Sequence, residues 1–214
     1  MSLSLAQTLL AWAYACFRVG EFSKTVDIVL ETLLVAQSLV EREAELSEAW
    51  KLIGDACYIG SLVCVDGINE LAVNATQVLE IHVSGRDGPL DGALPVDDPG
   101  DLVKTLLKAN IAAMERTVEL TNGDRLAHSA AYFNLGLARF HSSTAQDLET
   151  NTEWIRPILE CFKKAIHMEP GNFGYWNALG VATARHFPFI AEKAFSRCLQ
   201  INERVSNSPK FSHS

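Results

Sequence analysis

The sequence predicts an all-α protein built from repeated pairs of helices. Two observations carry this prediction. Most of the chain shows apolar residues spaced three and four apart, and sustained alternation or hairpin turns typical of strands are nearly absent. In addition, a short phrase recurs in which an aromatic residue is followed, four positions later, by glycine.

Composition restricts the classes of function. The chain has 214 residues, enough for one or two domains without disulfide support. Its formal charge of −8 and the absence of Lys/Arg runs argue against a protein that grips phosphate backbones. Five irregularly spaced cysteines indicate buried thiols in a reducing compartment. We therefore expect no direct contact with nucleic acid.

The first half of the chain predicts four helices. The first covers 4–19 and ends at Gly20, a residue favoured after a helix. It is apolar enough to suggest an export signal, but no Lys or Arg precedes it, and the run is too short to span a bilayer. The next helices are expected over about 23–43, 46–64 and 69–82.

The stretch 84–100 interrupts this pattern. Seven of its 17 residues are Gly or Pro and four are Asp, which predicts an inserted surface loop. Asp101 is then expected to cap a helix over 102–120. Two further pairs follow, 126–141 with 152–168 and 173–186 with 188–202, and Pro188 suits the first turn of the last helix.

The repeated phrase defines the first helix of a pair. Trp50 precedes Gly54, Tyr132 precedes Gly136 and Trp176 precedes Gly180, always with an aliphatic residue before the glycine. We expect the two helices to approach most closely at these glycines, so that closer packing outweighs the penalty of about 1 kcal/mol for a glycine inside a helix. Ala13 is the small residue expected in this role in the first pair.

A second phrase marks the partner helix. Phe162 and Ala165 follow Ile158 and close at Pro170, and the same spacing links Ala191 with Phe195. Together the two phrases resemble the tetratricopeptide repeat, a 34-residue helix-turn-helix unit. The structural repeat positions are expected to be Trp50, Gly54, Gly136, Phe162, Ala165, Pro170, Trp176, Gly180, Ala191 and Phe195.

We expect one solenoid over 1–214, with units at about 3–43, 45–121, 126–170 and 173–204 and a polar tail over 205–214. The loop 84–100 is inserted in the second unit. Stacked units of this kind form a right-handed α-solenoid. Because the tail offers no capping helix, the chain is expected to be part of a longer array.

No catalytic signature is present, and we expect neither an enzyme nor a cofactor or metal site. Phosphate-binding loops, nucleophile elbows and zinc-protease motifs are missing from the sequence, and its histidines are dispersed. Cys57 and Cys64 lie two turns apart on an apolar helix, where buried packing is favoured over thiol chemistry. If the chain were a redox protein, Cys57→Ser would abolish its activity.

Protein binding is the remaining function, and solenoids bind on the concave wall formed by the first helices. The register places eight residues on this wall: Lys51, Asp55, Tyr58, Phe133, Leu137, Asn177, Val181 and Arg185. A chaperone or trafficking adaptor would clamp a terminal carboxylate there. The wall has Phe133 where that clamp needs lysine, and Asp55 and Leu137 where it needs asparagine. The adaptor is therefore the alternative.

Two stretches carry a closer resemblance. Tyr175 to Val181, with Ala194-Phe195 and Leu199 to Asn202, resembles the tetratricopeptide scaffold subunit of the superkiller (Ski) complex, and Trp50 to Cys57 is similar to an earlier phrase of that subunit. The resemblance implies a non-catalytic cytoplasmic scaffold, also able to enter the nucleus. Its partners would be an RNA helicase and WD-repeat subunits, and the exosome indirectly, in 3′-to-5′ mRNA decay. No membrane contact is implied.

Overall fold

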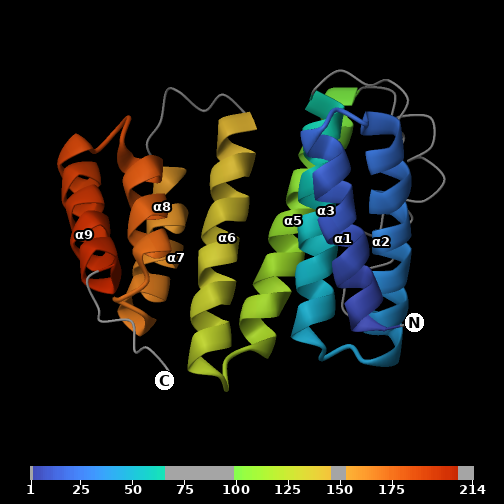
Figure 1. Ribbon diagram of the computed structural model, residues 1–214, viewed down its shortest axis with the longest axis horizontal. Coiled ribbons are helices and arrows are strands. Elements are labelled where there is room, and N and C mark those ends of the chain that lie inside the picture. The colour runs from blue at the N-terminus through green and yellow to red at the C-terminus, as the bar shows by residue number, and fades with distance from the viewer. Residues whose placement is uncertain (1, 66–98, 146–152, 207–214) are drawn as a thin grey trace, which may run out of the picture. The chain divides into compact units, whose positions relative to one another are not determined.

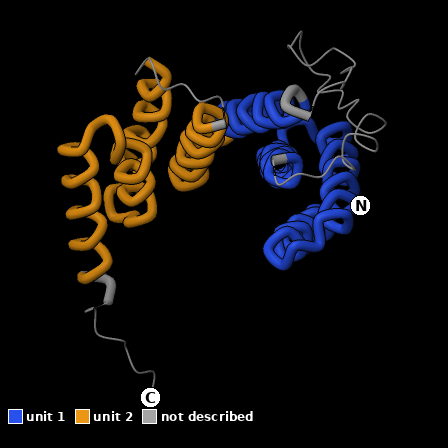
Figure 2. Tube along the Cα trace, turned by 90° about the horizontal axis from the view of Figure 1, so that it is seen from above, with its two compact units in different colours: residues 1–120 blue, residues 121–214 orange. Residues whose placement is uncertain are grey.

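The computed structural model describes residues 2–65, 99–145 and 153–206. Every helix or strand assigned in these ranges is an α-helix, so the predicted all-α class of helix-turn-helix repeats is confirmed. The chain divides into two compact units, Met1–Leu120 and Thr121–Ser214, which are coloured separately in Figure 2. The helix predicted over 69–82, the loop residues 84–98 and the tail from 207 lie outside the described residues.

The first unit contains four described helices, labelled in Figure 1. They are α1 (Leu3–Arg18), α2 (Phe22–Arg42), α3 (Ser47–Val65) and α5 (Pro99–Leu120). Helices α1, α2 and α3 pack against one another, with α1 and α3 running in the same direction and α2 in the opposite one (Figure 1). Helix α5 packs along α3 and completes its pair.

Local signals set both ends of α1. The Ser2 hydroxyl accepts a hydrogen bond from the Leu5 amide at 3.3 Å and caps the first turn. At the other end Gly20 has φ +79°, and the amide of Glu21 donates to the Cys16 carbonyl at 3.0 Å. This is the Schellman ending, which needs a residue without Cβ in the left-handed region. The turn into α2 is therefore encoded locally, as expected for Gly20.

The second unit consists of two antiparallel helix pairs. Its helices are α6 (Arg125–Ala145), α7 (Ile155–Met168), α8 (Phe173–Thr183) and α9 (Pro188–Ser206). Helix α6 pairs with α7 and α8 pairs with α9, while α7 joins the two pairs by packing on α8. Phe162 and Ala165 of α7 are fully buried at the centre of this unit's core.

Several predicted helix ends were wrong, including the start of α7, at Ile155 rather than 152, and the end of α9, at Ser206 rather than 202. Helix α5 starts at Pro99 rather than after Asp101, because proline is well tolerated at the first helical position. Helix α6 continues past His141 to Ala145, and within this polar run the Ser143 hydroxyl donates to the Phe140 carbonyl at 2.7 Å. Helix α8 ends at Thr183 rather than at 186.

The early end of α8 has a local cause. The Thr183 hydroxyl donates to the Leu179 carbonyl at 2.7 Å, and the Ala184 amide bonds three residues back, to the Val181 carbonyl, at 3.4 Å. Such a contact tightens a last turn. Pro188 follows four residues later and disfavours helical backbone at the residue before it.

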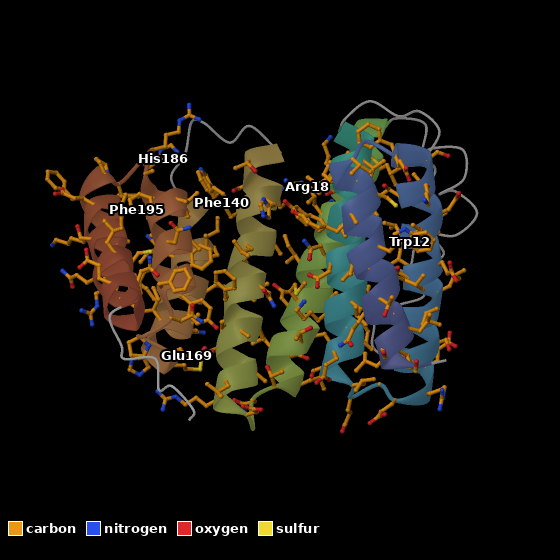
Figure 3. All side chains as sticks on the ribbon, in the orientation of Figure 1. Trp12, Arg18, Phe140, Glu169, His186 and Phe195 are labelled. Atoms are coloured by element: carbon orange, nitrogen blue, oxygen red, sulfur yellow. The ribbon has the colours of Figure 1, made fainter. Side chains whose placement is uncertain are left out.

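The glycines of the second unit lie where the paired helices touch. A Cβ added to Gly136 would come within 2.6 Å of Phe162 Cε1 and 3.2 Å of Cys161 Cβ on α7. A Cβ at Gly180 would come within 2.5 Å of the ring of Phe195 on α9, labelled in Figure 3. The optimal separation of two non-bonded carbon atoms is about 3.5–4.0 Å. Both helix pairs therefore use the missing side chain for close packing.

Gly54 makes a similar but softer contact. A Cβ there would lie 2.7 Å from Met114 Cε and 3.1 Å from Asn110 Oδ1, both on α5. The first atom ends a flexible side chain that can move away. In the pair of α1 with α2, Ala13 is fully buried.

Two tryptophans anchor the starts of first helices in the same way. The Trp50 indole N–H donates to the Ala44 carbonyl at 2.8 Å, and the Trp176 indole N–H donates to the Pro170 carbonyl at 2.9 Å. In both cases the acceptor lies six residues upstream. The hydrogen bond ties each first helix to the segment that precedes it, which gives the aromatic position a second role beyond packing.

Candidate functional site

The first unit carries a groove between α1 and α3, with a volume of about 460 Å³. Volumes of roughly 300–1,000 Å³ are typical of ligand-binding pockets. Ten residues line it, mostly with apolar surface: Gln7, Leu10, Ala11, Tyr14, Glu48, Lys51, Leu52, Asp55, Tyr58 and Ile59. Three of the eight predicted wall residues, Lys51, Asp55 and Tyr58, are among them.

These three residues share one face of α3 because they are spaced four and three apart. The Lys51 ammonium forms an ion pair with the Asp55 carboxylate, and their side chains are 44% and 29% exposed. An exposed pair four residues apart on a helix contributes about 0.3–0.5 kcal/mol. Burial raises the pKa of the Tyr58 hydroxyl, and the neighbouring Tyr14 raises it further, so the phenol stays neutral.

Helix α1 supplies groove residues that sequence reasoning missed. Leu10 is half-buried and Tyr14 is exposed. They lie three residues before and one residue after Ala13, as Lys51 and Asp55 lie relative to Gly54. Ala13 was recognised as the equivalent of the glycine, so the same count along α1 identifies both residues.

In the second unit, some of the predicted wall residues pack in the core and others lie at the surface. The Phe133 ring lies 4.8 Å from that of Tyr175 and 6.0 Å from that of Phe162. Leu137 is also half-buried against this core. Asn177 and Val181 are exposed on α8, while Arg185 lies in the turn after the helix end. The structure thus places Phe133 and Leu137 in packing and leaves the α8 residues at the surface.

A polar cluster connects the two pairs of the second unit. Glu169, labelled in Figure 3, follows the last residue of α7, and its Oε2 accepts from the Ser129 hydroxyl at 2.6 Å and the Tyr175 hydroxyl at 2.9 Å. Ser129 and Tyr175 are both buried. Burial is the main cause that raises the pKa of Tyr175. Because each buried hydroxyl has a partner, the cluster fixes the position of α6 against the start of α8.

Nucleophilic and metal-binding side chains are dispersed. Burial raises the pKa of the Cys57 thiol to about 12 and that of Cys64 to about 11, so both thiols are protonated at neutral pH and are poor nucleophiles. No group of three His, Cys, Asp or Glu side chains within the described ranges could hold a metal ion. In the same residues, no helix has the length and apolar character that a membrane crossing requires.

Comparisons with known proteins bear on the resemblance. No protein-family model matches the chain. Over 166 residues it is 27% identical to superkiller complex protein 3 of mouse, an alignment covering 74% of this chain. The human protein of that name is 26% identical over 169 residues, again 74% of this chain. The resemblance to the superkiller scaffold subunit is confirmed.

Superkiller protein 3 of Schizosaccharomyces pombe is 21% identical over 189 residues, which is 85% of this chain. The alignments cover 9% of the mouse and human proteins and 13% of the yeast protein. Among solved structures, a crystal structure of MamA matches with a TM-score of 0.38 and 17% identity, covering 98% of this chain and 96% of that one. MamA from Desulfovibrio magneticus RS-1 matches with a TM-score of 0.35 and 17% identity, over 95% and 97% of the two chains.

Proposed function

We propose that the chain is a non-catalytic scaffold that binds protein partners in a superkiller-type assembly. The observation that carries this proposal is the similarity to superkiller complex protein 3 in three species. The helix pairs support it, because repeats of this kind provide extended binding surfaces rather than enclosed catalytic sites. The acidic charge of −8 fits a scaffold that leaves RNA to its partners.

The partners in this proposal are an RNA helicase and WD-repeat subunits, and the exosome is reached through them. The assembly acts in 3′-to-5′ decay of mRNA in the cytoplasm, with the nucleus as an additional location. The contact surface includes the α1–α3 groove, with Lys51, Asp55 and Tyr58. A separate contact surface in the second unit includes Asn177 and Val181, which are exposed on α8.

The test is affinity purification of the tagged protein from its own cells, with nuclease treatment, followed by mass spectrometry. We expect an RNA helicase, a WD-repeat protein and exosome subunits to be recovered in amounts that nuclease does not reduce. Loss of these proteins after nuclease would mean that RNA, rather than the scaffold, connects them. Recovery of chaperones or unrelated cargo in their place would refute the superkiller assignment.

A further inference from the structure

We propose that the α1–α3 groove binds a protein segment that combines apolar side chains with a lysine or arginine placed beside Glu48. This inference rests on the proposed function, because it assumes that the chain binds protein partners. It goes beyond it by naming the chemistry that the groove selects. The shape and the charge of the groove carry the two halves of the proposal.

The apolar half follows from the lining. Leu52 and Ile59 are buried in α3, and Leu10 of α1 is half-buried opposite them. Tyr14 and Tyr58 add two aromatic rings, of which Tyr14 is 49% exposed. An occupant gains by covering this surface only if it presents apolar side chains, since polar groups would lose water without finding partners.

The basic part of the proposal, a lysine or arginine in the ligand, follows from the charges of the groove residues and the partners that they already have. Lys51 is the groove's cation, and it is paired with Asp55 on the same helix. Glu48 accepts a hydrogen bond from the neutral Ser47 hydroxyl at 3.0 Å, which leaves its negative charge in place. Glu43 and Glu45 are exposed in the connection that leads into α3. The charged residues that line the groove, Glu48, Lys51 and Asp55, carry a net charge of −1, and a cationic side chain beside Glu48 complements it.

The same charges argue against a carboxylate ligand. A terminal carboxylate would have to displace Asp55 from Lys51 and would lie near Glu48. Like charges placed together at an interface suppress the wrong partner. The charges of the groove therefore favour the scaffold over the adaptor alternative, in which Lys51 would hold the carboxylate of the ligand.

The experiment selects binders from a random 12-residue peptide library displayed on phage, with the whole 214-residue chain as the target. Enriched peptides are synthesised with a fluorophore, and their affinities are measured by fluorescence anisotropy. We expect enrichment of peptides that carry apolar residues together with Lys or Arg. Ala11→Gln, which places a larger side chain at an exposed lining position, should weaken their binding.

Two opposite changes in charge make the test specific. Glu48→Gln should weaken the affinity for the basic peptides about fivefold at low salt. This factor corresponds to the loss of one charge contact at about 4 Å in water. Lys51→Gln should tighten them by a similar factor, because it frees the Asp55 carboxylate. Glu31→Gln is the matched control, since Glu31 is exposed on α2 outside the groove, and it should leave the affinity unchanged.

Several results would overturn the proposal. They are enrichment of acidic peptides that Lys51→Gln weakens, binding that Ala11→Gln and Glu48→Gln leave unchanged, or no enrichment at all. Circular dichroism of each variant shows whether the helices are intact. If affinity purification still recovers the helicase and WD-repeat proteins with Glu48→Gln and Ala11→Gln combined, the scaffold function stands and only the groove assignment fails.

Discussion

Replacing Gly136 by alanine tests whether a missing side chain sets the distance between α6 and α7. The new Cβ would lie 2.6 Å and 2.9 Å from two ring atoms of Phe162 and 3.2 Å from Cys161 Cβ. These distances are short of van der Waals contact by about an ångström at the ring. Phe162 is fully buried, so its ring has no open space to enter, and the helices must move apart.

The magnitude follows from two opposing terms. Overpacking a core typically costs about 1–3 kcal/mol, and a fully buried ring favours the upper part of that range. Alanine is better than glycine inside a helix by about 1 kcal/mol. The net effect is a loss of about 1–2 kcal/mol, which corresponds to roughly tenfold faster exchange of the α6 and α7 amides.

Two other glycines are the matched comparisons. Gly54→Ala should be nearly neutral, because the nearest atom is the terminal methyl of Met114, which can rotate away. Gly171→Ala meets nothing within 4 Å and should not destabilise the second unit. Hydrogen exchange measured by mass spectrometry reports each helix separately. Unchanged or slower exchange of α6 and α7 in Gly136→Ala, with faster exchange of α3 in Gly54→Ala, would refute the reasoning.

Three further predictions concern single residues. Gly20→Ala should lower the free energy of unfolding by about 1–2 kcal/mol because φ is +79°, whereas Gly123→Ala, with no neighbour within 4 Å, should change it little in urea denaturation. Trp50→Phe should lower it by about 0.5–1.5 kcal/mol through loss of the hydrogen bond to Ala44, and an unchanged urea midpoint would contradict this. Burial raises the pKa of Cys57 from 9.0 to about 12, so its contribution to stability is complete below pH 9 and is lost as the pH rises toward 12. The loss should be at most about 1.4 kcal/mol per pH unit above 9, and Cys57→Ala should flatten the curve.

The repeat could be predicted because its cause is periodic and local. Gly136 and Phe162 belong to phrases with fixed spacing, and helix pairing brings them together wherever those phrases occur. The cluster of Ser129, Glu169 and Tyr175 could not be predicted in this way. Its first and last members are separated by 46 residues, and no phrase relates their polar side chains.

The α1–α3 groove contains wall residues and an ion pair that could not be predicted from the sequence. The wall positions of α1 were not predicted, although Ala13 is the small residue expected in its phrase, because Leu9 stands in place of the aromatic residue. The spacing of Lys51 and Asp55 along α3 was predicted, but their mutual ion pair was not. It depends on the rotamers of two long side chains, and it decides which ligand charge Lys51 can accept.

Equivalent wall positions differ in how far they are covered, because their neighbouring residues differ in size. Phe133 of α6 is covered by Tyr175, which precedes the aromatic of the next first helix, α8. In α3 the residue that precedes the aromatic is Ala49, which is small and buried. Leu10 of α1, which is equivalent to Phe133, lines an open groove. The shared phrase therefore specifies the helix pair but not its capacity to bind. In this chain the groove lies between the two first helices of which the second, α3, has a small residue before its aromatic.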